Sequence, residues 1–153
     1  MAMTMQGEVV LPAGRDKVWT ALNDPDVLKS CIPGCQELEK TSDTGFRAVA
    51  KLSIGPVKAT FKGAVTLSDL DPPNGYTISG EGQGGVAGFA KGGAKVRLED
   101  SEGGTRLTYD VDAQVGGKIA QLGGRLINGV AKKYADEFFA NFAKRLTPAE
   151  NPA

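Results

Sequence analysis

Alternating apolar and polar residues run through most of the chain up to residue 115 and predict β-strands. In residues 3–11, apolar side chains occupy mainly the odd-numbered positions and polar side chains mainly the even-numbered ones, which is typical of a half-buried strand. A weaker segment covers residues 38–41. The same alternation recurs in residues 46–54, 57–68, 76–84, 94–99 and 106–115. Because the links are short, we expect about seven strands in an antiparallel sheet with one apolar face.

Two short helices are predicted between the first two strands. The first begins near Pro12, and Val18 and Leu22 lie one turn apart on its apolar side. Asp24 can cap the second helix, and Pro25 suits its first position, where the missing N–H is no loss. The sequence Pro33-Gly34 then ends this helix.

A long helix is expected to cover the apolar face of the sheet. Apolar residues recur there at intervals of three or four positions, and the prediction is a single helix over residues 118–146. This apolar seam drifts around the helix axis, which suits a helix crossing a twisted sheet. Gly123, Gly124 and Gly129 interrupt the first half of the helix. They indicate close packing, a frayed first turn, or room for a ligand. Residues 1–146 thus form one α+β domain, and the polar, proline-containing residues 147–153 are expected to be a flexible tail.

Composition narrows the possible chemistry. The chain has 153 residues with 18 basic and 18 acidic side chains, so its formal net charge is zero. A neutral protein has no general attraction to nucleic acid or anionic lipid, and only a local patch of basic residues could bind them. No stretch approaches the ~20 apolar residues of a membrane-spanning helix. The N-terminal residues lack the features of a secretory signal, so we expect a cytoplasmic protein. The absence of histidine excludes Ser-His-Asp and Cys-His catalysis and removes the commonest zinc ligand.

Several motifs together resemble the family of the carbon monoxide dehydrogenase G subunit, within the START-like superfamily of helix-grip proteins. They are residues 5–13 (MQGEVVLPA), 18–19 (VW), 22–25 (LNDP), 31–35 (CIPGC), 54–57 (IGPV), 80–82 (GEG) and 89–92 (FAKG). The resemblance covers nearly the whole chain and implies a curved antiparallel sheet around a long C-terminal helix, with a hydrophobic cavity between them. It also implies an accessory role for aerobic bacterial molybdenum hydroxylases such as carbon monoxide dehydrogenase. Membrane recruitment of the enzyme and electron transfer to quinone are associated with this role.

The candidate site is a cavity that binds an apolar ligand, such as a lipid or a quinone. Glycines at inward strand positions, such as Gly80 and Gly82, would leave volume inside the sheet or allow it to curve. Phe89 lies in a glycine-rich link and is either a lid or a core residue. The expected lining and gating residues are Phe61, Val65, Tyr76, Ile78, Phe89, Tyr109, Val111, Leu122, Leu126 and Val130.

No catalytic, metal or cofactor site is assigned. We interpret Cys31 and Cys35 as inert thiols, since Pro33-Gly34 separates them and no histidine could complete a zinc site. We therefore expect a non-catalytic adaptor whose partners are a hydrophobic small molecule and the molybdenum hydroxylase enzyme. Peripheral contact with the inner face of the cell membrane is included in this expectation. The alternatives are a START-like enzyme of cyclase or hydrolase type, and a purely structural docking module.

Overall fold

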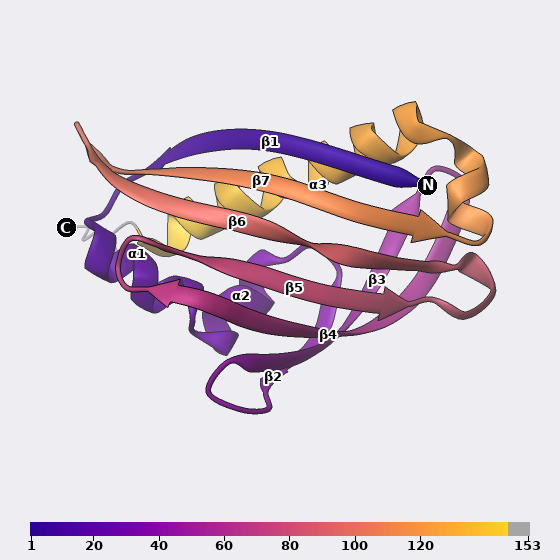
Figure 1. Ribbon diagram of the computed structural model, residues 1–153, viewed down its shortest axis with the longest axis horizontal. Coiled ribbons are helices and arrows are strands. Elements are labelled where there is room, and N and C mark those ends of the chain that lie inside the picture. The colour runs from indigo at the N-terminus through magenta and orange to yellow at the C-terminus, as the bar shows by residue number, and fades with distance from the viewer. Residues whose placement is uncertain (147–153) are drawn as a thin grey trace.

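The computed structural model describes residues 1–146, in which one seven-stranded antiparallel sheet curves around a long helix (Figure 1). The strands lie in the order β1-β7-β6-β5-β4-β3-β2, so the first strand pairs with the last. Their bounds are β1 Ala2–Leu11, β2 Cys35–Lys40, β3 Gly45–Ile54, β4 Val57–Asp71, β5 Gly75–Gln83, β6 Phe89–Ser101 and β7 Gly104–Gly116. The α+β helix-grip fold expected from the alternation is thereby confirmed. The proposed tail, residues 147–153, lies outside the described residues.

The two short helices follow β1 as predicted, and their sequence signals are visible in the structure. They are α1 Arg15–Leu22 and α2 Pro25–Cys31. The Asp24 carboxylate accepts a hydrogen bond of 2.9 Å from the backbone N–H of Asp26, and Pro25 occupies the first helical position. The Thr105 hydroxyl donates a 2.6 Å hydrogen bond to the Ala13 carbonyl, which ties the start of α1 to β7.

The prediction of one continuous helix over residues 118–146 is wrong. The structure has a 3₁₀ helix, η2 Lys118–Leu122, followed by the α-helix α3 Gly124–Leu146. Gly123 separates them at φ +93°, a backbone conformation that favours glycine and cannot continue an α-helix. Leu122 therefore does not belong to the long helix.

The placement of Phe89 in a link between strands is also wrong. Phe89 is the first residue of β6 and pairs with Gln83 of β5 and Gly116 of β7. The link is shorter and contains the 3₁₀ helix η1 Gly85–Ala87. The glycine-rich sequence of residues 88–93 concealed this part of the strand because glycine has a low strand propensity.

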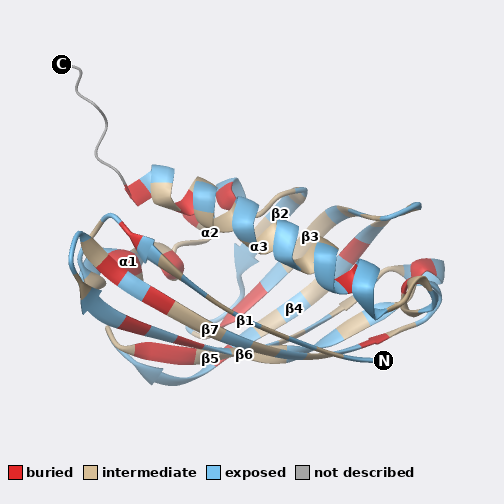
Figure 2. Ribbon diagram, turned by 90° about the horizontal axis from the view of Figure 1, so that it is seen from above, coloured by how far each residue is buried: buried red, intermediate tan, exposed pale blue. Residues whose placement is uncertain are grey.

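Two apolar clusters fill opposite ends of the space between sheet and helices (Figure 2). The larger cluster joins α1, α2 and the second half of α3 to the sheet, and it includes the fully buried Phe142 and Leu107. The smaller cluster joins η1, η2 and the start of α3 to the sheet through Phe61, Val115 and Ile127. These clusters fix α3 across the concave face, and the candidate site lies on the same inner side.

Candidate functional site

An apolar pocket of about 310 Å³ lies against the larger cluster, between the inner face of the sheet and the helices. This volume is equivalent to about ten waters at ~30 Å³ each, and lies at the lower end of the range for small-molecule sites. Strands β3 to β7 form its floor, Leu22, Leu28 and Ile32 close one side, and α3 covers it. The lining residues are Leu22, Leu28, Ile32, Leu38, Phe46, Ala48, Val65, Leu67, Tyr76, Ile78, Val96, Leu107, Phe138 and Phe139.

Tyr76 supplies the only polar side chain among the residues that line this pocket. It is 6% exposed, and its ring centroid lies 5.2 Å from that of Trp19. Burial raises the pKa of Tyr76, so the phenol stays protonated near neutral pH. No fully buried side-chain nitrogen or oxygen within residues 1–146 lacks a hydrogen-bond partner, so the Tyr76 hydroxyl is not an unsatisfied buried group. Tyr76 supplies the one side-chain hydroxyl among the residues of an otherwise hydrocarbon lining, and a hydroxyl can both donate and accept a hydrogen bond.

A shallow apolar groove adjoins the pocket along the inner face of the sheet. Val65 and Ile78 line both spaces, and Val111 lines the groove. Gly80 and Gly82 contribute to its floor at inward positions of β5. The inward glycines thus leave space against the sheet, as one of the two sequence interpretations predicted.

The predicted lining residues do not all meet in one place. Val65, Tyr76 and Ile78 line the pocket, and Val111 lines the adjoining groove. Phe61 is a buried member of the smaller cluster. Tyr109 stacks on Phe139 at 5.4 Å between ring centroids and lines a separate surface hollow beside Gly7.

The remaining four candidates lie away from the pocket. Phe89 points to the outer face, where its ring covers Gly116, whereas the neighbouring Ala90 packs inward. Leu122 and Leu126 lie near the β3–β4 turn, and Leu126 is 37% exposed. Val130 is half-buried on α3 and lines neither the pocket nor the groove. Phe89, Leu122, Leu126 and Val130 are thus misplaced as pocket residues.

Sequence reasoning missed the contribution of the helices to the pocket. It located ligand space beside the glycines of residues 123–129, but the pocket lies under Phe138 and Phe139. The apolar side of α2 was a usable signal, because Leu28 and Ile32 needed a covering element. Asn141 of α3 donates a 3.0 Å hydrogen bond to the Cys31 carbonyl and holds α2 there.

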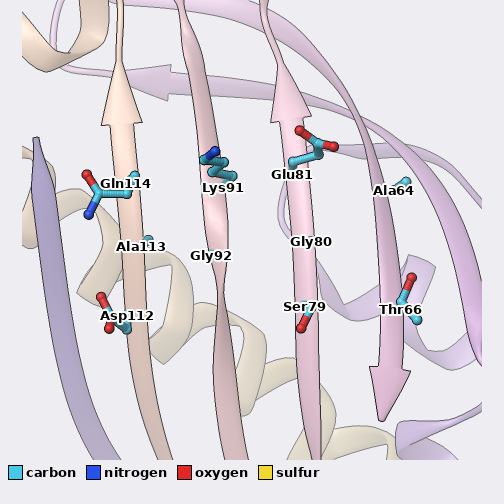
Figure 3. A pocket seen from close by; sticks show the side chains of 10 residues that line it. All are labelled: Ala64, Thr66, Ser79, Gly80, Glu81, Lys91, Gly92, Asp112, Ala113 and Gln114. Carbon is cyan, nitrogen blue, oxygen red and sulfur yellow. The ribbon is translucent and has the colours of Figure 1, made fainter.

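A larger hollow of about 630 Å³ lies on the outer, convex face of the sheet (Figure 3). Figure 3 shows the side chains of Glu81, Lys91, Asp112 and Gln114 on the side of the sheet away from α3. The hollow is open to solvent and carries charges of both signs. Because it cannot exclude water from a ligand, the inner pocket is the better candidate for binding an apolar molecule.

The two cysteines are free thiols, and neither belongs to a metal cluster. Cys31 is buried and Cys35 is half-buried, and burial raises the pKa of both thiols. No three His, Cys, Asp or Glu side chains within residues 1–146 come together in a way that could hold a metal ion. In the same part of the chain, no helix combines the length and apolar character needed to cross a membrane.

Comparison with solved structures finds the same fold in several proteins. A conserved protein from Geobacillus kaustophilus is 32% identical, with a TM-score of 0.88 over 94% of this chain and 95% of that chain. The Zhui aromatase/cyclase of a Streptomyces species is 12% identical, with a TM-score of 0.69 over 95% and 94%. Ara h 8.0201 is 17% identical, with a TM-score of 0.66 over 95% and 98%. The last two show the fold alone.

The sequence comparisons agree with the motifs in residues 5–13 and 31–35. No curated protein sequence is significantly similar to this chain. The profile of the CoxG family, described as the G subunit of carbon monoxide dehydrogenase, however, matches residues 7–147. Since this match spans nearly the whole helix-grip domain, the chain belongs to the CoxG family.

Proposed function

We propose that this protein is a non-catalytic carrier of a quinone- or lipid-like molecule that assists a molybdenum hydroxylase of the carbon monoxide dehydrogenase type. The observation that carries the proposal is the inner pocket of about 310 Å³, whose lining is hydrocarbon except for Tyr76. A molecule with an apolar body and one carbonyl or hydroxyl oxygen matches this lining. Its oxygen would accept the hydrogen bond that the Tyr76 hydroxyl can donate.

The same lining supports binding in preference to catalysis. Tyr76 is the only titratable residue among the side chains that surround the pocket. Its raised pKa makes it a poor general base near neutral pH, because the deprotonated form is scarce. An enzyme of the type represented by the Zhui aromatase/cyclase remains the alternative. Turnover of a polyketide or ester that stops in Tyr76→Phe would contradict the carrier role.

The family description supports the choice of partner in this proposal. The family description connects CoxG proteins with carbon monoxide dehydrogenase. Within the proposal, the carrier supplies the enzyme with quinone and thereby links substrate oxidation to electron removal. A purified enzyme of this type should reduce a water-insoluble quinone faster when this protein is added.

Trp19 provides a direct test of pocket occupancy. It is the only tryptophan in the chain, and its ring lies 5.2 Å from that of the pocket residue Tyr76. A quinone in the pocket should therefore quench the intrinsic fluorescence in a saturable manner. Native mass spectrometry of the same samples should show one bound quinone per chain. If neither signal saturates, the protein is a structural docking module and the carrier proposal is wrong.

Two alanine substitutions provide matched variants for this titration. Ala48 lines the pocket, whereas Ala64 lies on the outer face and lines the convex hollow. Ala48→Phe places a ring in the pocket and should abolish saturable quenching. Ala64→Phe adds the same ring to the outer surface and should leave quenching unchanged.

A further inference from the structure

The two edge strands of the sheet, β1 and β2, differ in how well they are protected against pairing with a further strand (Figure 1). β2 has only six residues, three of them charged, and its register with β3 shifts between Cys35 and Glu37. Short length, charges and bulges are the usual features that block an exposed edge. β1 has ten residues, an uninterrupted register with β7, no proline and one charged residue, Glu8. β1 therefore presents an unprotected edge.

The pairing of β1 with β7 identifies the backbone groups that face this open edge. Met1 and Val115 exchange two backbone hydrogen bonds, each of 2.7 Å. Because hydrogen-bonded and non-hydrogen-bonded pairs alternate along an antiparallel ladder, the odd-numbered residues of β1 bond to β7. The N–H and C=O groups of the even-numbered residues therefore point to the open edge, and within residues 1–146 no backbone group of a helix or turn pairs with them. These five residues are Ala2, Thr4, Gln6, Glu8 and Val10.

The sequence of β1 is complementary to itself in one antiparallel register. With Gln6 on a two-fold axis, Gln6 faces its own copy, Thr4 faces Glu8, and Ala2 faces Val10. All five open residues of both strands then lie in hydrogen-bonded pairs, whereas a shift of two residues in either direction leaves one end unpaired. No two charged side chains lie opposite each other in this register, so no like charges repel.

The same register covers apolar side chains on both faces of the sheet. Val10 is 51% exposed on the outer face, and Ala2 of a second copy would lie beside it. On the inner face, Gly7 and Val9 line a hollow of about 290 Å³ between β1 and α3, so the helix leaves space beside this edge. Met5 and Met3 of a second copy would lie opposite Gly7 and Val9, at this hollow. Methionine suits such a position, because its flexible side chain fills irregular gaps.

We propose that two copies of this chain associate by antiparallel pairing of their β1 strands about a two-fold axis at Gln6. Each copy donates five backbone hydrogen bonds to the other, and the two sheets become one continuous sheet. A strand from a different protein could use the same edge, but it would not account for the complementarity of β1 to itself. No residue of β1 lines the inner pocket, so both copies keep their binding sites.

The first test is sedimentation velocity of the full chain over a wide range of protein concentrations. The mean mass should rise from that of a monomer to that of a dimer and no further, because pairing about a two-fold axis is closed. A monomer even at the highest concentration would overturn the proposal and leave the edge to a strand of another protein. Growth beyond the dimer would also overturn it.

Charge substitutions at Gln6 test the register. Side chains directly opposite in an antiparallel pair have Cβ atoms about 5 Å apart, so Gln6→Lys places like charges face to face and should weaken association on the order of fivefold. Gln6→Glu should do the same. An equal mixture of the two variants should restore association, because residue 6 faces residue 6. The controls are Ser79→Lys and Ser79→Glu on the exposed outer face of the central strand β5, which should leave association unchanged.

Proline substitutions test the backbone pairing. Gln6→Pro removes an N–H that points to the open edge and spares the bonds to β7, so it should weaken association about tenfold or more. Lys40→Pro is the matched control on β2. The N–H of Thr41 bonds to the Gly45 carbonyl at 2.8 Å, so the N–H of Lys40 points away from β3 by the same alternation. Lys40→Pro should leave association unchanged, and circular dichroism should show that both variants are folded.

The variants also distinguish this interface from any other. Association that is unaffected by Gln6→Pro and by both charge substitutions would place the contact on another surface and overturn the proposal. Weakened association that the mixture does not restore would show that Gln6 is not on the axis, which overturns the proposed pairing. If Gln6→Pro fails to fold, the charge substitutions decide the question. Quenching of Trp19 by quinone should be the same in all variants, because β1 does not line the pocket.

Discussion

Tyr76 shows how a single polar atom can give an apolar pocket selectivity. Tyr76 is the one residue with a polar side chain in the lining of the pocket, and a hydroxyl in an apolar site favours a ligand that can form a hydrogen bond with it. We expect Tyr76→Phe to weaken quinone binding about threefold to tenfold, equivalent to one net hydrogen bond of ~0.5–1.5 kcal/mol. Tyr109→Phe should have no effect, since Tyr109 lines a different hollow. Fluorescence titration of both variants is the measurement, and equal losses would contradict the assignment.

Because Tyr76 is buried, we expect the free energy of unfolding to fall at high pH. Burial raises the pKa of Tyr76 in the native state above the value of ~10 expected in the unfolded chain. Above pH ~10 the unfolded chain releases this proton first, so the free energy of unfolding falls by about 1 kcal/mol per pH unit. Below that pH the contribution is fully present. Urea denaturation across this range should show a shallower decline for Tyr76→Phe than for the unchanged protein, and parallel declines would refute the effect.

Substitutions of Phe142 and Phe89 test which of these rings belongs to the core and which lies on the outer face of the sheet. Phe142 is completely buried and its ring centroid lies 5.5 Å from that of Phe138, so Phe142→Ala should cost about 3–5 kcal/mol of unfolding free energy. Phe89 is 38% exposed on the outer face, so Phe89→Ala should cost about 1 kcal/mol or less and leave ligand retention unchanged. Chemical denaturation measures both. A severe effect of Phe89→Ala would show that its ring belongs to the core.

At the level of elements, the sequence pattern predicted the strands and helices that are marked by periodic side chains. It missed the element boundaries that lie at glycines. Alternation located the six longer strands because one face of each is turned inward, and Asp24-Pro25 located the start of α2. The short edge strand β2 has no such alternation, and its sequence signal was correspondingly weak. The break at Gly123 and the start of β6 at Phe89 were not predictable in this way. At both places glycines replace the side chains that carry the periodic signal, and tertiary pairing decides the structure.

Some glycines of the inner groove have room for a side chain and others do not, and substitutions at Gly82 and Gly92 should show this difference. A Cβ atom on Gly82 would meet only the Lys62 carbonyl oxygen, at 3.9 Å, whereas one on Gly92 would overlap the backbone of Asp112 and Ala113. Gly82→Val should therefore leave the free energy of unfolding unchanged or raise it by about 0.5–1 kcal/mol, because glycine is unfavourable within a strand. Gly92→Val should lower it. Thermal denaturation of the two variants is the comparison, and similar losses in both would contradict the geometry.

At the scale of the whole molecule, the sequence predicted the fold better than the site. The inward faces of β4 and β5 were correct, so Val65, Tyr76 and Ile78 were found. Phe138, Phe139 and Leu28 were missed because their position depends on how α2 and α3 pack, which periodicity does not specify.

A ligand in the inner pocket should stabilise the entire domain, because the pocket is built from elements that separate on unfolding. Its walls come from α1, α2, α3 and the sheet, so the unfolded chain retains no such site. Quinone at about 100 times its dissociation constant should add ~2.7 kcal/mol to the free energy of unfolding. For a domain of this size, this corresponds to a rise in Tm of roughly 5–10 °C. Differential scanning calorimetry should show this rise for Ala64→Phe and not for Ala48→Phe, whose added ring occupies the pocket. An equal rise in both variants would place the ligand elsewhere.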